Sequence, residues 1–117
     1  MNLLLFRIAA ALCFIAVALG AFGAHGLKGM LTARDMLGAW EKAVFYQFVH
    51  ALALLALAFV ANVNKPATML LVAGIALFSG SLYMMALSNV RALGAITPLG
   101  GLCFLAGWAW LAISPTR

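Results

Sequence analysis

The stretch WEKAVFYQFVH, residues Trp40 to His50, leads from two charged side chains directly into a run of apolar residues. The eleven residues that follow, through Ala61, are all apolar. Gln47 and His50 therefore lie within a segment that has the composition of a membrane helix. Unpaired polar groups are costly in hydrocarbon, so both side chains need hydrogen-bond partners. The stretch predicts a membrane helix with polar side chains on one face.

The rest of the chain has the composition of a membrane protein. Of its 117 residues, 68% are hydrophobic and 8% are charged, and the mean hydropathy is +1.17. Soluble domains carry roughly 25% charged residues, so an ordinary soluble fold is excluded. We predict an all-α membrane protein with a single integral membrane domain, residues 1–117, built as a four-transmembrane-helix bundle. The four apolar runs cover about 3–24, 44–61, 67–88 and 97–114.

The connection between the first two runs has a helical pattern of its own. Thr32 and Asp35 resemble a capping box at the start of a helix over about 33–42. We predict a short interfacial amphipathic helix here, with Trp40 as its anchor in the headgroup region. The apolar side chains that this helix turns toward lipid are Met36, Leu37 and Trp40.

The other connections are short, at residues 62–66 and 89–96, which makes the last three helices antiparallel neighbours. The first run ends in a small-x-small pattern, Ala21-Phe22-Gly23, of the kind that signal peptidases cleave. The run is longer than the apolar region of a signal peptide, and Arg7 follows apolar residues rather than preceding them. We therefore predict that this helix is retained.

Small residues recur at seven-residue intervals and so return to nearly the same face of each helix. Helices in lipid associate through close packing, which small residues allow. We therefore predict four closely packed helices. The predicted seams are Ala9, Ala16 and Gly23 in the first run, Ala51 and Ala58 in the second, Gly74, Ser81 and Ser88 in the third, and Gly100, Gly107 and Ser114 in the fourth.

The net charge of +5 is spread over the ends of the apolar runs, where cations suit lipid headgroups. No base-stacking platform accompanies the charges, so nucleic acid is not a predicted partner. The predicted partners are the lipid bilayer and either another membrane protein or a second copy of the chain. When the amino terminus is counted, the two sides of the membrane carry equal numbers of cations, so the charges favour neither orientation of the protein. These cations are Arg7, Lys65 and Arg117 on one side, and Lys28, Arg34, Lys42 and Arg91 on the other.

The polar residues of the apolar runs gather in one half of the predicted bundle. Tyr46, Gln47 and His50 share one helix face, because steps of three and four residues return to it. Counting along antiparallel helices at 1.5 Å per residue brings polar residues of the third run to similar depths. The resulting candidate cluster for a ligand or a proton relay is His25, Tyr46, Gln47, His50, Ser79, Ser81 and Tyr83.

Three interpretations of His50 stay open at this point. It can hydrogen-bond a serine of the third helix or a backbone carbonyl and so hold two helices together. It can relay protons or bind a ligand together with Tyr46 and Gln47. It can also ligate a metal or a haem, but no third ligand accompanies His25 and His50, so we predict neither metal nor cofactor.

No catalytic set is visible in the sequence. Asp35 and Glu41 lie six residues apart beside basic residues, as in surface ion pairs. Cys13 and Cys103 lie inside apolar runs without metal or redox spacing. No nucleophile elbow, phosphate loop or zinc motif is present. We therefore predict that the protein is not an enzyme and has no catalytic residues.

Four segments together carry a resemblance to a known family: residues 20–27 (GAFGAHGL), Trp40-x-x-Ala43-x-x-Tyr46-Gln47-x-x-His50, residues 78–83 (FSGSLY) and residues 96–101 (ITPLGG). The chain resembles the small membrane proteins catalogued as domain of unknown function family 423, and is similar to the eukaryotic transmembrane protein 256 group. The resemblance covers essentially the whole chain. It implies an integral membrane protein, in bacteria of the inner (plasma) membrane, and implies no activity.

Three functions remain as hypotheses. The first is a non-enzymatic accessory, scaffold or assembly partner in the membrane, which the short hydrophilic loops favour. The second is a conduit or binding protein for protons or small molecules, with a polar half-cavity around His50. The third is a lipid- or haem-handling protein.

Overall fold

The computed structural model describes residues 1–116. Within them all regular elements are helical, and the only strand-like pairing is an isolated bridge between Val63 and Thr116. The all-α prediction is therefore confirmed. The elements are α1 (Leu3–Ala24), α2 (Lys28–Ala33), α3 (Leu37–Leu57), α4 (Lys65–Gly74), the π-helical η1 (Ile75–Ser79), α5 (Gly80–Ser88), the 3₁₀-helical η2 (Arg91–Ala95) and α6 (Thr97–Ile113).

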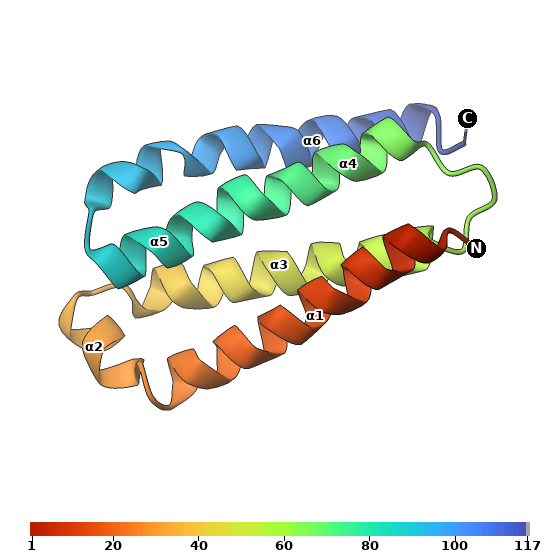
Figure 1. Cartoon of the computed structure of the whole chain (residues 1–117). Coiled ribbons are helices and arrows are strands. Elements are labelled where there is room, and N and C mark those ends of the chain that lie inside the picture. The colour runs from red at the N-terminus through yellow and green to blue at the C-terminus, as the bar shows by residue number, and fades with distance from the viewer. Residues whose placement is uncertain (117) are drawn as a thin grey trace.

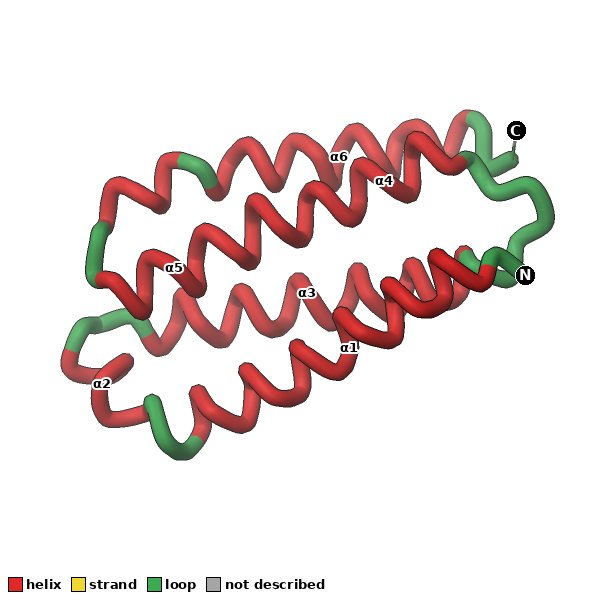
Figure 2. Tube along the Cα trace, viewed as in Figure 1, coloured by secondary structure: helices red, strands yellow, loops and turns green. Residues whose placement is uncertain are grey.

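The long helical segments lie side by side and run alternately in opposite directions (Figure 1): α1, α3, α4–η1–α5 and η2–α6. α1 packs on α3, α3 packs on the segment α4–η1–α5, and α6 packs on α4 and η1. The segments α3 and α4–η1–α5 are therefore central, with α1 and α6 on the outside. The molecule measures 47 × 25 × 16 Å, so the row of helices is flattened. Figure 2 shows that the loops gather at the two ends, with the N-terminus beside the α3–α4 connection.

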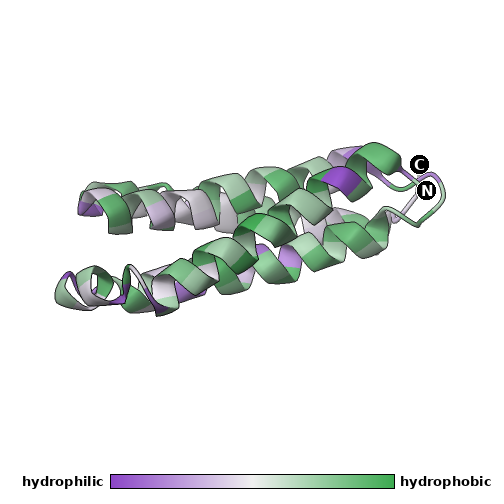
Figure 3. Cartoon of the chain, turned by 60° about the horizontal axis from the view of Figure 1, so that its bottom comes forward, coloured by the Kyte–Doolittle hydropathy of each residue, from purple (hydrophilic) through white to green (hydrophobic). Residues whose placement is uncertain are grey.

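Within residues 1–116, three helical segments are long and apolar enough to cross a membrane: Leu3–Ala24, Lys65–Ser88 and Arg91–Ile113. Hydrophobic positions dominate the long helices in Figure 3. α3 has 21 residues and is long enough, but its charged and polar residues lower its hydropathy. The structure thus shows an all-helical membrane protein with three such segments.

The boundaries of α3 differ most from the sequence prediction. α3 begins at Leu37 rather than at residue 44, and it ends at Leu57 rather than at residue 61. Hydropathy marks where a helix enters lipid, whereas the backbone is helical well before that point. At the other end, turns follow Leu57, and within them Asn62 has a φ of 53°, a left-handed conformation that asparagine tolerates.

The connection between α1 and α3 also differs from the prediction. The predicted amphipathic helix over 33–42, expected to bend into or continue as the second span, begins too early: α2 ends at Ala33, and residues from Leu37 onward are the continuous start of α3. Asp35 lies between them with a φ of 55°, in the left-handed region. The Thr32 hydroxyl donates to the Lys28 carbonyl at 2.7 Å and caps no following helix, so the capping-box prediction is wrong too.

Met36 and Trp40 point into the protein, and each is only 1% exposed. The Trp40 indole N–H donates to the Leu19 carbonyl of α1 at 2.8 Å. Its ring lies edge-on to Tyr83, with centroids 4.9 Å apart, and directly against Gly23. A Cβ at position 23 would occupy the space of the indole. The predictions that these two residues face lipid and that Trp40 is an interface anchor are therefore wrong.

Most members of the predicted seams pack between helices. Gly100 of α6 lies against the backbone of Phe78, and a Cβ on Gly107 would lie 2.8 Å from Cδ2 of Leu71. The prediction is wrong for Ser88, which is exposed. Seam residues that are buried are Ala9, Ala16, Gly23, Ala51, Ala58, Gly74, Ser81, Gly100 and Gly107.

Side chains that bond to backbone join neighbouring helices at both ends of the molecule. At one end the Arg34 guanidinium donates at 2.9 Å to each of the last two α5 carbonyls before Ser88. Arg91 donates to the Arg34 carbonyl, also at 2.9 Å. At the other end Asn64, which is fully buried, donates to the Ser114 carbonyl at 2.8 Å. These contacts fix α2 to α5 at one end of the molecule and α4 to α6 at the other.

Candidate functional site

Gln47 of α3 connects the helices on both sides of it. It is 2% exposed. Its Nε2 donates to the Leu12 carbonyl of α1 at 2.9 Å, and its Oε1 accepts from the Tyr83 hydroxyl of α5 at 2.6 Å. A single amide therefore links α1, α3 and α5.

His50 has two hydrogen bonds whose directions are set by its partners. Its Nδ1 lies 2.7 Å from the Tyr46 carbonyl oxygen, which can only accept. Its Nε2 lies 3.0 Å from the Trp108 indole nitrogen, which can only donate. Nδ1 therefore carries the proton, and the ring is the neutral imidazole. The predicted bond to a serine is wrong, and the alternative partner, a backbone carbonyl, is present.

The His50 ring also stacks on Phe104 of α6, with centroids 3.7 Å apart and planes at 13°. Sequence analysis missed both α6 partners, Phe104 and Trp108. One signal was available: an indole N–H in an apolar helix needs an acceptor. Phe104 and Trp108 are four residues apart and so share a helix face. Which neighbouring helix they face depends on tertiary packing.

The two serines of the predicted cluster join other pairs of helices. Ser79 is fully buried, and its Oγ donates to the Ala43 carbonyl of α3 at 2.7 Å. Ser81 donates to the Phe78 carbonyl at 3.0 Å, so its single hydroxyl proton is used there. The Thr97 hydroxyl, 2.6 Å away, then donates to Ser81 Oγ. Ser81 therefore ties α5 to the start of α6.

The π-helical turn η1 lies where three helices meet. It contains Phe78, whose backbone contacts Gly100, and Ser79, which bonds α3. Single π turns are frequent at functional sites because they interrupt the regular ladder and redirect side chains. Here the turn serves packing, since its side chains and backbone contact both α3 and α6.

Two residues of the predicted cluster lie apart from the others. His25 ends α1 and is exposed, and its ring has no partner among residues 1–116. Tyr46 is 37% exposed and its ring packs on Phe78, with centroids 4.6 Å apart. Its hydroxyl has no hydrogen-bond partner among the same residues. The structure therefore does not bring all seven predicted residues into one site.

The buried polar atoms satisfy one another. Across the part of the chain that the structure describes, no buried side-chain nitrogen or oxygen lacks a hydrogen-bond partner. Within the same residues, no group of three or more His, Cys, Asp or Glu side chains is placed to hold a metal ion. The arrangement suits the locking of helices to each other.

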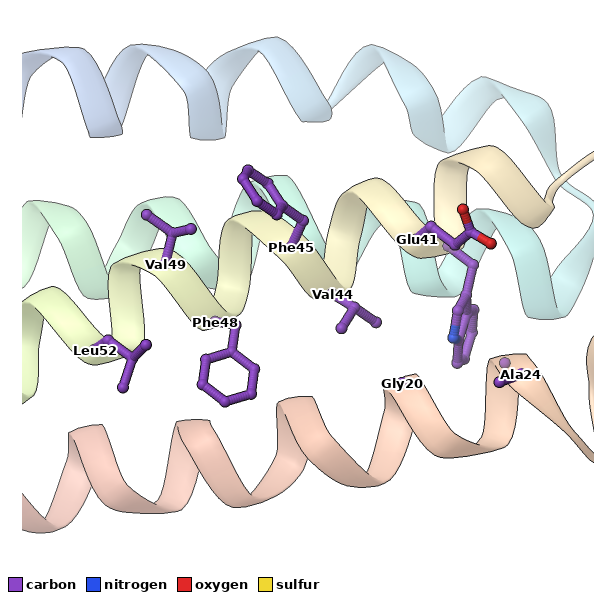
Figure 4. A pocket seen from close by; sticks show the side chains of 10 residues that line it. Gly20, Ala24, Glu41, Val44, Phe45, Phe48, Val49 and Leu52 are labelled. Carbon is purple, nitrogen blue, oxygen red and sulfur yellow. The ribbon is translucent and has the colours of Figure 1, made fainter.

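Two apolar grooves open on the sides of the helix row. One lies beside His50, between α3 and α6, with a volume of about 630 Å³ and aromatic walls that include Tyr46, Phe78 and Trp108. The other lies between α1 and α3, with a volume of about 470 Å³ (Figure 4). Both are lined almost entirely by apolar atoms.

The sequence matches the family described as protein of unknown function (DUF423) over residues 19–101, which include Gln47, His50 and Tyr83. The chain belongs to the DUF423 family. The resemblance to family 423 is thereby confirmed. No solved structure matches this DUF423 protein.

Relatives of this DUF423 protein are named membrane proteins. The chain is 52% identical over 116 residues to a UPF0382 membrane protein of Staphylococcus haemolyticus, covering 94% of this chain and 93% of that one. It is 42% identical over 109 residues to a UPF0382 membrane protein of Bacillus subtilis, covering 88% of each chain. Together with the apolar helices, these relatives confirm the prediction of an integral protein of a bacterial membrane.

Proposed function

We propose that this DUF423 protein is a non-enzymatic, four-span membrane scaffold that acts as an accessory or assembly partner of other membrane proteins. The observation that supports this most is that every buried side-chain nitrogen and oxygen in residues 1–116 already has a hydrogen-bond partner. Gln47 and His50 use their hydrogen bonds to join helices. A site for catalysis keeps donors and acceptors free for its substrate, and these groups are already engaged with each other.

In this proposal α3 is the fourth span. Its 21 residues extend roughly 31 Å, which matches the hydrocarbon thickness of about 30 Å. It lies between α1 and α4–η1–α5, which are both apolar enough to cross a membrane (Figure 1). Its central polar side chains bond within the protein, and this lowers the cost of placing them in the bilayer.

Labelling of single cysteines tests the four-span topology. In a variant in which Cys13 and Cys103 are replaced by serine, one cysteine is introduced at Gly38 or at Asn62, near the two ends of α3. We expect a membrane-impermeant thiol reagent to label the two positions from opposite sides of the membrane. Asn2 serves as the control and is expected to share the side of Asn62. Labelling of Gly38→Cys and Asn62→Cys from the same side contradicts the proposal.

The outer helices offer the surface for a partner. α1 and α6 each pack mainly on one neighbour, so much of their apolar surface is free. Extended loops add little to the surface on which a partner could bind, because the connections from α3 to α4 and from α5 to α6 are short. Contact within the membrane is therefore the mode of association that this surface supports.

Replacement of His50 by leucine tests the scaffold proposal. The change removes the bond to Trp108, and we expect a loss of about 1 kcal/mol in the free energy of unfolding. Thermal stability and retention of membrane partners on purification are expected to fall together. The control is Val49→Leu, at a neighbouring exposed position. A folded, fully associated His50→Leu variant that loses only a transport or chemical activity contradicts the scaffold role.

One observation favours the alternative of a conduit or small-molecule binding protein. The groove beside His50 contains Tyr46, whose hydroxyl has no partner among residues 1–116. A pH-dependent flux into liposomes that His50→Ala abolishes supports this alternative over the scaffold. Absence of such a flux in the unaltered protein removes it.

A further inference from the structure

The groove between α1 and α3 has one acidic side chain in an otherwise apolar lining. Figure 4 shows Val44, Phe48 and Leu52 of α3 directed toward α1, with Gly20 opposite Val44. A Cβ at Gly20 would lie 3.4 Å from Cγ1 of Val44, in van der Waals contact, so a side chain larger than alanine there would extend into this space. Glu41 stands at one end of the groove. The groove thus runs along the outer side of the α1–α3 pair, with the Glu41 carboxylate at one end.

In a bilayer that α1 spans, Glu41 lies near the boundary between lipid headgroups and acyl chains, because it is beside the end of that helix. It lines the groove together with Ala24, the last residue of α1. From Glu41 to Leu52, at the other end of the lining, the helix advances eleven residues, or roughly 17 Å. The groove therefore runs from the edge of the membrane toward its middle, in the direction of an acyl chain.

The Glu41 carboxylate has no partner among the residues that the structure describes. It is exposed, and it makes no ion pair or hydrogen bond to any residue of 1–116. It is one of only two acidic residues in the chain. A carboxylate at the boundary of the hydrocarbon is stabilised by a cation that donates hydrogen bonds to it.

We propose that this groove binds a phospholipid with a primary ammonium headgroup, of the phosphatidylethanolamine class. Its acyl chain lies along Val44, Phe48 and Leu52, and its ammonium donates to the Glu41 carboxylate. A quaternary choline headgroup cannot donate such a bond, and a glycerol headgroup carries no cation. Four cations stand at this end of the molecule, so a zwitterionic headgroup fits better than a purely cationic amphiphile: Lys28, Arg34, Lys42 and Arg91.

Native mass spectrometry of the purified full-length protein tests this proposal. The protein is equilibrated in detergent with equal amounts of phosphatidylethanolamine, phosphatidylcholine and phosphatidylglycerol of the same chain length. We expect phosphatidylethanolamine to be retained preferentially. Glu41→Gln is expected to reduce this retention about tenfold, the effect of one charged hydrogen bond. Asp35→Asn, which removes the other carboxylate of the chain outside the groove, is expected to leave retention unchanged.

A second pair of variants tests the groove itself while Glu41 stays in place. Gly20→Leu fills the space opposite Val44 and is expected to release the bound lipid. Ala21→Leu, at the adjacent exposed position, is expected to retain it. Thermal melting of each variant shows whether the fold is kept, and Glu41→Gln does not depend on that outcome.

Three results overturn the proposal. The first is equal retention of phosphatidylglycerol, and the second is unchanged phosphatidylethanolamine retention in Glu41→Gln. The third is a stable dimer in which a cysteine introduced at Phe48, with Cys13 and Cys103 replaced by serine, forms a disulfide with its counterpart, which assigns the groove to a second copy of the chain. None of these results depends on whether the protein serves as a scaffold, so the lipid site and the proposed function fail or stand separately.

Discussion

Replacing Gly100 by alanine is expected to lower the free energy of unfolding by about 3 kcal/mol. A Cβ built at Gly100 would lie 2.7 Å from the Cα and 2.8 Å from the Cβ of Phe78, and closer still to its amide nitrogen. Backbone atoms cannot rotate away as the end of a side chain can. α6 therefore has to move away from η1, which also strains the bond between Thr97 and Ser81. Thermal or steric-trap unfolding in detergent measures the change.

Gly101→Ala is the matched control for this prediction. No heavy atom lies within 4 Å of a Cβ built at Gly101, and the residue belongs to the same helix. Alanine favours a helix over glycine by roughly 0.5–1 kcal/mol, so this variant is expected to be as stable as the unaltered protein or slightly more stable. Equal stabilities of Gly100→Ala and Gly101→Ala would show that α6 and η1 do not approach this closely.

Replacing Gln47 by methionine is expected to lower the free energy of unfolding by about 2 kcal/mol. Methionine keeps the length and approximate volume of the side chain but removes both interhelical hydrogen bonds. The Tyr83 hydroxyl then loses its acceptor inside the protein, which costs more than the loss of a bond exposed to water. The change is measured by the same unfolding experiment.

Ser88→Ala is the control for Gln47→Met. Ser88 is exposed, and its hydroxyl bonds only within its own helix region, to the Met84 carbonyl at 2.6 Å and from the Val90 amide at 3.2 Å. Its removal is expected to change stability by less than about 0.5 kcal/mol. A Gln47→Met variant that is as stable as Ser88→Ala contradicts the role of Gln47 as a link between helices.

The apolar runs predicted helix positions well where a helix contains only its apolar run and no charged extension. α1 begins at Leu3 and ends at Ala24, the limits that the first apolar run indicates. The prediction failed between Ala33 and Ala43, where charged residues continue α3 beyond its apolar part. Trp40 was misplaced for a related reason. Composition describes a tryptophan as suited to the interface, and only tertiary packing shows that Gly23 leaves room for it inside.

The sequence predicted the part of the candidate site that depends only on how deep each residue lies along antiparallel helices. Counting along the helices placed polar residues of the third run at the depth of the polar face of α3, and the structure bonds one of them, Tyr83, to Gln47. The partners of His50 depend instead on which helix packs over it and on the π turn η1. A π turn rotates the residues that follow it, and nothing in the apolar pattern predicts one. The serines therefore face other partners.

The central claim is that the polar side chains of α3 serve to hold helices together, and a double-mutant cycle between Gln47 and Tyr83 tests it most directly. The unfolding free energies of the unaltered protein, Gln47→Met, Tyr83→Phe and the double variant are compared in detergent. We predict a coupling energy of about 1 kcal/mol, typical of interhelical hydrogen bonds in membrane proteins. Effects of the two replacements that add to within about 0.3 kcal/mol contradict the claim.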